Sequence, residues 1–297
     1  MQNFRLLFGA LALLALLLTN SCNLINPDEP IPSYVHIEDY SVITDLENQG
    51  TAQHNIFDVW VVHNGIIIAT VPIPCTVPVL QEKGNIVTIF PGIKENGTST
   101  NRSIYPFFDG IELDLDFNPG AIDSFFASDI AFQYNPATKF LWLEDFENET
   151  FSLQEINPDS APFQRIKNPN KVFEGNASLQ VILTEKDSLL SLQSFNFFPG
   201  SDFNIGSPTF LEIHYKNEAN LQIGFAYKSA NNIIQYDQPH LYLRESDEWK
   251  KVYVKMTDQV ALLADQAGIK VYFAALLPND KEQAEILIDN IKLITFE

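Results

Sequence analysis

The sequence predicts an all-β protein made of two β-sandwich units in tandem. Short runs rich in β-branched and aromatic residues recur along most of the chain, with Gly, Pro, Asn and Asp between them, which is the pattern of strands and turns. Helical periodicity is confined to one short segment near the C-terminus. The chain has 297 residues, of which 45% are hydrophobic and 23 are Phe, and this is enough apolar material for two cores.

The first 22 residues have the features of a secretion signal. Arg5 precedes an uncharged apolar run over residues 6–18, which is shorter than the roughly 20 apolar residues that a membrane span needs. A cysteine at the cleavage point, Cys22, resembles the signal peptide of a Bacteroidota lipoprotein, in which this residue is lipidated and becomes the N-terminus. The resemblance implies a lipid anchor in the outer membrane and exposure at the cell surface. The alternative is an ordinary secretory signal followed by an unrelated cysteine.

The chain is strongly acidic, with 18 Lys and Arg against 38 Asp and Glu and a formal net charge of −20. Removal of the signal deletes one charged residue, Arg5, and takes the net charge to −21. Such a charge repels nucleic acid and anionic membrane surfaces, so we expect no nucleic-acid partner. If Cys22 carries lipid, Cys75 has no disulfide partner, and the exported fold must depend on its core or on a metal.

Residues 23–33 predict a linker, because three prolines in eleven residues block regular structure. The first sandwich is expected over residues 34–138. Within it, strand-like runs are short and separated by turn residues, a pattern that resembles a small Ig-like or transthyretin-like sandwich.

The clearest hairpin of the first unit joins residues 57–63 to residues 66–71. Asn64-Gly65 lies between the two runs, and both positions of a type I′ turn need positive φ. Prolines at 72, 74 and 78 cannot donate to a strand ladder, so residues 71–79 predict an edge strand or an irregular crossing. Residues 86–90 predict a further strand that ends at Pro91-Gly92.

Residues 111–117 alternate strictly, with Glu112, Asp114 and Asp116 on one face and apolar residues on the other. Neighbouring acids on such a face lie about 6.6–6.8 Å apart. A solvated sheet face is the expected explanation. A hard-cation site or an acid/base pair of a hydrolase is the alternative.

The second sandwich is expected over residues 139–297. A short helix is predicted after Thr257, where Val260 and Leu263 share a face. Nine short strand candidates favour a sandwich or jelly roll; they cover residues 140–146, 178–183, 192–198, 210–215, 221–227, 240–243, 251–255, 269–274 and 286–293.

Four short motifs occur in order along the second unit. They are LEDFE at 143–147, FEGNASLQV at 173–181, DEWKKVYV at 247–254 and IDNIKL at 288–293. This order resembles the jelly-roll carbohydrate-binding modules and their galactose-binding-like relatives, in which a DFE strand, a GxxSL strand, a WxxV strand and a closing DNI strand recur. The resemblance covers a little over half of the mature chain.

The resemblance implies a structural calcium that joins the first and last strands of the second unit. The matching positions are Glu147, the backbone carbonyls from Gly175 to Ser178, and Asp289. Two carboxylates and several carbonyls supply part of the roughly six to eight oxygens that calcium takes. The alternative is that Asp289 caps a turn and Glu147 is solvated.

The resemblance also implies a place for sugar. Family members stack sugar rings on exposed aromatic side chains of the concave sheet or its loops, which makes Tyr227, Tyr236 and Tyr242 the candidate ligand-binding residues here. Such rings offer the apolar surface that sugar C–H groups favour. Each of the three tyrosines could instead fill a core.

Enzyme signatures are absent from the sequence, which contains no HExxH, GxSxG, P-loop or CxxC motif, and its five histidines are dispersed. We therefore expect no catalytic residues and a non-enzymatic, lipid-anchored protein that binds or scaffolds as a surface accessory of an outer-membrane complex. Exposed coplanar aromatics would favour a glycan-binding lipoprotein of a polysaccharide-utilisation system instead. A large exposed apolar patch would favour a subunit of secretion or outer-membrane-protein insertion machinery. Converging carboxylates, for example at Asp114 or Asp116, would favour a glycoside hydrolase.

Overall fold

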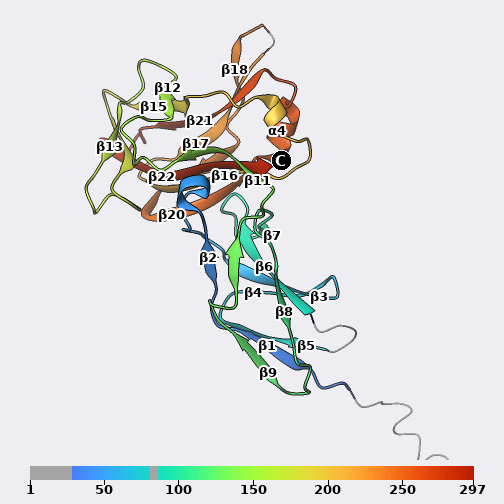
Figure 1. Cartoon of the computed structure of the whole chain (residues 1–297). Coiled ribbons are helices and arrows are strands. Elements are labelled where there is room, and N and C mark those ends of the chain that lie inside the picture. The colour runs from blue at the N-terminus through green and yellow to red at the C-terminus, as the bar shows by residue number, and fades with distance from the viewer. Residues whose placement is uncertain (1–28, 81–85, 230) are drawn as a thin grey trace, which may run out of the picture.

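The computed structural model describes residues 29–80, 86–229 and 231–297 (Figure 1). The predicted signal peptide, Cys22 and the first residues of the predicted linker lie outside this part of the chain. The described residues form β-sheets joined by loops, with short helices only, which confirms the predicted all-β sandwich and jelly-roll fold class. Within these residues, no helix has the length and apolarity needed to cross a membrane.

The first part of the described chain contains a three-stranded sheet in the order β5–β1–β9, a two-stranded sheet of β10 and β2, and a five-stranded sheet in the order β4–β3–β6–β7 with β8 on β6. β1 starts at the last residue of the predicted linker. The elements are β1 (Ser33–Ile37), β2 (Ser41–Ile43), α3 (Leu46–Gln49), β3 (Asp58–His63), β4 (Ile66–Val71), β5 (Cys75–Val79), β6 (Ile86–Lys94), β7 (Arg102–Ile104), β8 (Ile111–Asp114), β9 (Ile122–Phe125) and β10 (Ala131–Gln133).

The β3–β4 hairpin confirms the predicted turn. Asn64 has φ 52° and Gly65 has φ 76°, the positive values that a type I′ turn requires. β5 pairs with β1 alone, so the proline-rich segment supplies an edge strand, as predicted.

The predicted strand end at Pro91-Gly92 is wrong, because β6 continues through this dipeptide to Lys94. Proline has no N–H, but its carbonyl still takes part in the sheet and accepts a hydrogen bond from the N–H of Tyr105 at 2.8 Å. A Cβ at residue 92 would overlap the carboxylate of Asp58, so glycine is needed here for close approach and not for a turn.

The second part of the described chain contains two six-stranded sheets. We call β13–β14–β22–β16–β20, with β11 on β22, the proximal sheet, and β12–β15–β21–β17–β18, with β19 on β17, the distal sheet. The elements are β11 (Thr138–Glu144), β12 (Leu153–Glu155), β13 (Phe163–Ile166), β14 (Ser178–Thr184), β15 (Leu189–Ser194), η1 (Gly200–Asp202), β16 (Thr209–Asn217), β17 (Leu221–Lys228), β18 (Ile234–Tyr236), β19 (Leu241–Leu243), β20 (Ser246–Lys255), α4 (Thr257–Leu263), β21 (Gly268–Leu276) and β22 (Gln283–Phe296).

Most predicted strands of this part exist, with two kinds of difference. The strand predicted over 192–198 is observed as β15 over Leu189–Ser194, so the prediction was placed too far toward the C-terminus. β12, β13 and β18 were not predicted, because each is three or four residues long and lacks a clear apolar alternation. The helix after Thr257 is confirmed as α4, but the hydroxyl of Thr257 accepts a hydrogen bond from the N–H of Thr209 at 3.1 Å and caps no helix N–H.

The first part of the chain packs on the outer face of the proximal sheet. Phe210 of β16, Tyr253 of β20 and Ile294 of β22 are buried in the hydrophobic core of the first part. The ring of Phe107, from the first part, lies with its centroid 5.9 Å from that of Phe210. The distal sheet lies on the side away from this junction (Figure 1), so the first part of the chain does not cover its outer face.

Candidate functional site on the distal sheet

The outer face of the distal sheet is defined by alternation along β21. Ile269, Val271 and Phe273 are fully buried in the core between the two sheets. The intervening residues Lys270 and Tyr272 therefore belong to the outer face. The register places Gln193 of β15 and Gly224 of β17 opposite Tyr272 on its two neighbouring strands.

Tyr272 lies across β17 and forms the centre of this face. A Cβ at residue 224 would overlap the phenol ring of Tyr272, so Gly224 gives the ring room to lie against the strand. The Tyr272 hydroxyl donates to the backbone carbonyl of Asp237 at 2.9 Å. Burial raises the pKa of Tyr272, so the phenol stays protonated and can donate this hydrogen bond well above neutral pH.

Tyr236 extends the aromatic surface. It lies opposite Ala226 of β17, which lies opposite Lys270, so all three belong to the outer face. The Tyr236 and Tyr272 rings have centroids 5.9 Å apart at an interplanar angle of 68°. The Tyr236 hydroxyl donates to the amide oxygen of Gln193 at 3.2 Å, and 45% of the residue's surface is exposed.

Tyr242 of β19 is the third tyrosine of the face. It lies opposite Gln222, two residues before Gly224 on β17, and 57% of its surface is exposed. Tyr242 and Tyr236 thus pair with β17 four residues apart, a separation of about 13 Å along the strand. The outer face therefore presents two exposed tyrosine rings, Tyr236 and Tyr242, over the length of a short oligosaccharide, with the buried ring of Tyr272 beside Tyr236.

Tyr227, the remaining tyrosine that the sequence suggested, does not belong to this group. It lies opposite Ile269 and packs against the core between the sheets, so it is on the other face of β17. Its hydroxyl donates to the amide oxygen of Gln235 at 2.6 Å. The structure therefore brings Tyr236 and Tyr242 to one face and separates Tyr227 from them.

The chemistry of the outer face suits a ligand that has both apolar faces and hydroxyl groups. The exposed phenol rings of Tyr236 and Tyr242 offer flat apolar surface, and the half-buried Gln222 adds an amide group beside Tyr242. At the other end of the face, the ammonium of Lys270 lies 4.6 Å from the ring centroid of Phe197 and donates to the carbonyl of Phe195.

The residues predicted to hold calcium lie near one another, in the loop after β11, in the loop before β14 and in β22, but their carboxylates already accept hydrogen bonds. Glu147 accepts from the backbone N–H groups of Asn176 and Ala177 at 2.7 and 3.0 Å. Burial acts against ionisation of Glu147, but these hydrogen bonds outweigh it and lower the pKa of the carboxyl. Gly175, with φ 69°, lies directly against the Glu147 carboxylate.

Asp289 has a different environment. Its carboxylate accepts from the hydroxyl of Ser178 at 2.6 Å and from the N–H of Asn290 at 2.8 Å. Burial raises the pKa of Asp289 to about 7. A divalent cation would offset that burial by supplying positive charge.

The guanidinium of Arg165 occupies part of the same loop cluster. It donates to the backbone carbonyls of Phe146 and Glu147, both at 2.7 Å, and these carbonyls are oxygens that a cation would otherwise use. Among the described residues, no group of three or more His, Cys, Asp and Glu is arranged to hold a metal ion. The donor set thus offers two carboxylates beside competing N–H donors, and the calcium site stays a prediction.

The acidic triplet of the first part is confirmed as a solvated face. Glu112, Asp114 and Asp116 are exposed, while Leu113 and Leu115 between them are buried. Exposed carboxylates on an open strand do not form the enclosed pair that a glycoside hydrolase requires.

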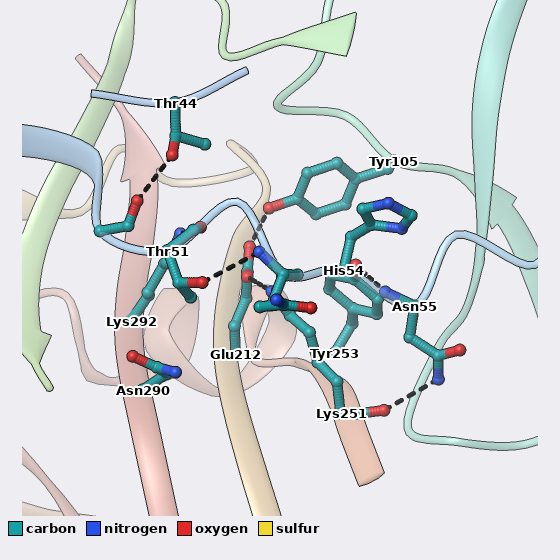
Figure 2. A network of polar contacts seen from close by, with 12 residues as sticks. Thr44, Thr51, His54, Asn55, Tyr105, Glu212, Lys251, Tyr253, Asn290 and Lys292 are labelled. Carbon is teal, nitrogen blue, oxygen red and sulfur yellow. Dashed lines mark hydrogen bonds and ion pairs between the residues drawn. The ribbon is translucent and has the colours of Figure 1, made fainter. Parts of the chain in front are cut away.

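A buried polar network joins the two parts of the chain (Figure 2). Glu212 of β16 is at its centre, 1% exposed. Its carboxylate forms an ion pair with Lys251 at 2.5 Å and accepts hydrogen bonds from the hydroxyls of Tyr105 and Tyr134, the latter at 3.3 Å. The cations and the acceptor all lie on the proximal sheet, and the tyrosines come from the first part.

Two lysines of this network hold the segment around Thr51 and Gln53. The ammonium of Lys292 donates to the carbonyl of Thr51 at 2.7 Å, and that of Lys251 donates to the carbonyl of Gln53 at 2.8 Å. Burial lowers the pKa of Lys292 to about 7, although the negative charge of Glu212 acts in the opposite direction. The enclosure of Glu212 leaves no access for a substrate, so this network is structural.

Sequence reasoning missed Tyr272, Gln193 and the network around Glu212. The alternation of residues 268–276 contained a signal for Tyr272, since it places the phenol opposite three apolar core residues. The network had no sequence signal, because Glu212 and Lys251 lie on different strands and look like ordinary surface charges.

No protein-family model and no curated protein matches this sequence. Among solved structures, a CBM22 xylan-binding domain from Paenibacillus barcinonensis is similar at 16% identity over 54% of this chain and 97% of that chain, with a TM-score of 0.37. A family 22 carbohydrate-binding module from Clostridium thermocellum is similar at 13% identity over 53% of this chain and 94% of its own, with a TM-score of 0.38.

A family 11 carbohydrate-binding module of a cellulosomal cellulase from Clostridium thermocellum is similar at 15% identity over 52% of this chain and 93% of that chain, with a TM-score of 0.34. Scores and identities of this size do not assign a ligand to this chain.

Proposed function

We propose that this chain is a non-catalytic glycan-binding protein, held at the outer membrane by lipid on Cys22. The observation that carries the proposal is the aromatic row on the outer face of the distal sheet. Tyr236 and Tyr242 are exposed, and Tyr272 lies buried beneath a ligand's path between them. Sugar rings present C–H groups that pack on such phenol faces, and their hydroxyls match the amide of Gln222.

The proposed lipid anchor on Cys22 suits a glycan-binding role. A protein tethered through Cys22 keeps its glycan site at the cell surface, where polysaccharide arrives. One acyl chain binds a membrane only reversibly, so the multiple acylation of bacterial lipoproteins matters for a stable anchor.

A glycan array with the full chain, followed by titration calorimetry on the glycans that bind, tests the proposal. Tyr242→Ala should weaken binding roughly tenfold, because it removes one stacking surface. Phe126→Ala is the matched control, since Phe126 is 51% exposed but belongs to the first part of the chain. The absence of any bound glycan, or equal effects of the two substitutions, would contradict the proposal.

A scaffold role in an outer-membrane complex is the second candidate, and one observation favours it. β4 is the edge of its sheet, and Ile66, Ile67 and Ile68 are 64%, 50% and 40% exposed. An apolar edge strand can pair with a strand of another protein. A pull-down from native outer membranes with wild-type protein and with Ile67→Lys tests this role, which predicts a partner that the lysine variant loses.

A further inference from the structure

We infer that a pocket at the junction binds the carboxylate of a hexuronate unit, which would make acidic polysaccharide the preferred glycan of this protein. This inference rests on the proposed glycan binding and specifies the class of glycan. The pocket has a volume of about 750 Å³, within the range of ligand sites. One wall is formed by Asn55, Lys94 and residues 96–99 of the first part, and the other by Tyr215 and residues 241–245 and 250–252.

The charge of this pocket is opposite to that of the chain. Acidic residues outnumber basic ones 38 to 18 in the sequence. In the lining, four residues are cationic and one is anionic: Lys94, Arg244, Lys250 and Lys251 against Glu245. A local excess of positive charge in so acidic a chain indicates an anionic ligand.

Two of these cations are available to a ligand. Arg244 and Lys250 are exposed, and neither forms an ion pair with any residue in the part of the chain that the structure describes. Lys251 is engaged by Glu212. The single acid, Glu245, is neutralised by Lys281 at 2.7 Å, so it does not compete for Arg244 or Lys250.

The remaining lining groups suit a sugar acid better than a bare ion. Thr98 and Ser99, on the loop between β6 and β7, are exposed hydroxyl residues that can bond to ligand oxygens. Arg244 presents a planar fork that matches a carboxylate with two parallel hydrogen bonds.

Tyr242 connects the pocket to the aromatic row, because it lines the pocket and also belongs to the outer face of the distal sheet. Tyr242 lies on the edge strand β19, so a glycan that contacts this ring would also reach the pocket. The net charge of −20 disfavours non-specific binding of polyanions elsewhere on the chain, so measured binding of an acidic glycan would report on this local site.

Titration of the full chain with oligogalacturonides, with their methyl esters and with inorganic phosphate tests the inference. The double variant Arg244→Ala/Lys250→Ala should weaken binding of the acid form about tenfold or more and leave binding of the ester unchanged. Lys167→Ala/Lys186→Ala is the matched control, because it removes the same charge from exposed residues that do not line the pocket. This control should bind like the wild type.

The outcomes separate this inference from the proposed function. Equal binding of the acid form by the wild type and by the Arg244/Lys250 variant overturns the pocket but leaves glycan binding intact. If the protein binds a neutral glycan but does not bind the acid form, the pocket is likewise overturned and glycan binding is intact. Displacement of the acid form by equimolar phosphate overturns the hexuronate assignment, and failure to bind any glycan overturns both proposals.

Discussion

Replacement of Glu212 with Gln should destabilise the protein severely, because the carboxylate of Glu212 forms the buried ion pair with Lys251 and accepts hydrogen bonds from Tyr105 and Tyr134. The Gln amide oxygen could still accept from Tyr105, but its NH₂ group would face the ammonium of Lys251, which lies 2.5 Å from the carboxylate in the native protein. Removing one partner of a buried ion pair costs about 3–5 kcal/mol of unfolding free energy. That loss is a large share of the roughly 5–15 kcal/mol that stabilises a typical domain.

The pH dependence of this loss is a second, independent signature. The pKa of Lys292 in the folded protein is about 7, below its ordinary value of 10.5, so between these pH values the unfolded chain binds more protons. The free energy of unfolding therefore rises with pH in that window. Without Glu212 the pKa of Lys292 in the folded protein falls further below 7, so the deficit of the variant should narrow as the pH rises toward and through 7, above which Lys292 is neutral in both folded proteins.

Urea denaturation followed by tryptophan fluorescence, at several pH values, measures both effects. Glu185→Gln is the control, because Glu185 is exposed and its substitution removes the same charge. A loss below about 1 kcal/mol at pH 7 would refute the buried-pair argument, since that is the size of a surface ion pair. A deficit that does not narrow as the pH rises from about 5 to 8 would refute the role of the lysine charge.

Three further predictions concern the anchor, the loops and the sheet. Cys22→Ser should release soluble protein from membranes on fractionation, and membrane retention of this variant would contradict the anchor. If calcium joins the loop after β11 to β22, EDTA should lower the Tm of the full chain, and an unchanged Tm would show that the hydrogen bonds of Glu147 and Asp289 suffice. Gly224→Ala should displace the ring of Tyr272, costing about 1–3 kcal/mol of stability and weakening glycan binding in calorimetry; wild-type affinity would show that ligands do not use this ring.

The fold was predictable where local signals coincide with tertiary structure. Asn64-Gly65 specifies its own turn, and the alternation around Leu113 and Leu115 reports which side faces the core. Pro91-Gly92 was interpreted as a turn, and this prediction was wrong because the glycine allows close packing against Asp58. Such a contact lies across strands, and no window of sequence reveals it.

The candidate site was predictable only in part, for a related reason. Tyr236 and Tyr242 could be proposed as ligand residues, but nothing local distinguishes them from Tyr227. Tyr227 packs on the core side of the distal sheet, whereas Tyr236 and Tyr242 lie on its outer face. That assignment depends on strand register, and a shift of one residue exchanges the two faces. Register is fixed by pairing with β21, far along the sequence, and so becomes visible only in the folded chain.

The junction network and the acidic-glycan pocket should be coupled, because they share Lys251. The tyrosine row belongs to one sheet, whereas the pocket has walls from both parts of the chain and needs the junction to hold them together. Glu212→Gln, assayed under conditions where the variant is still folded, should therefore weaken binding of oligogalacturonides more than binding of their methyl esters. Equal weakening of both ligands would mean that the junction supports the whole fold without positioning the pocket, and unchanged binding of both would mean that the pocket does not depend on the network.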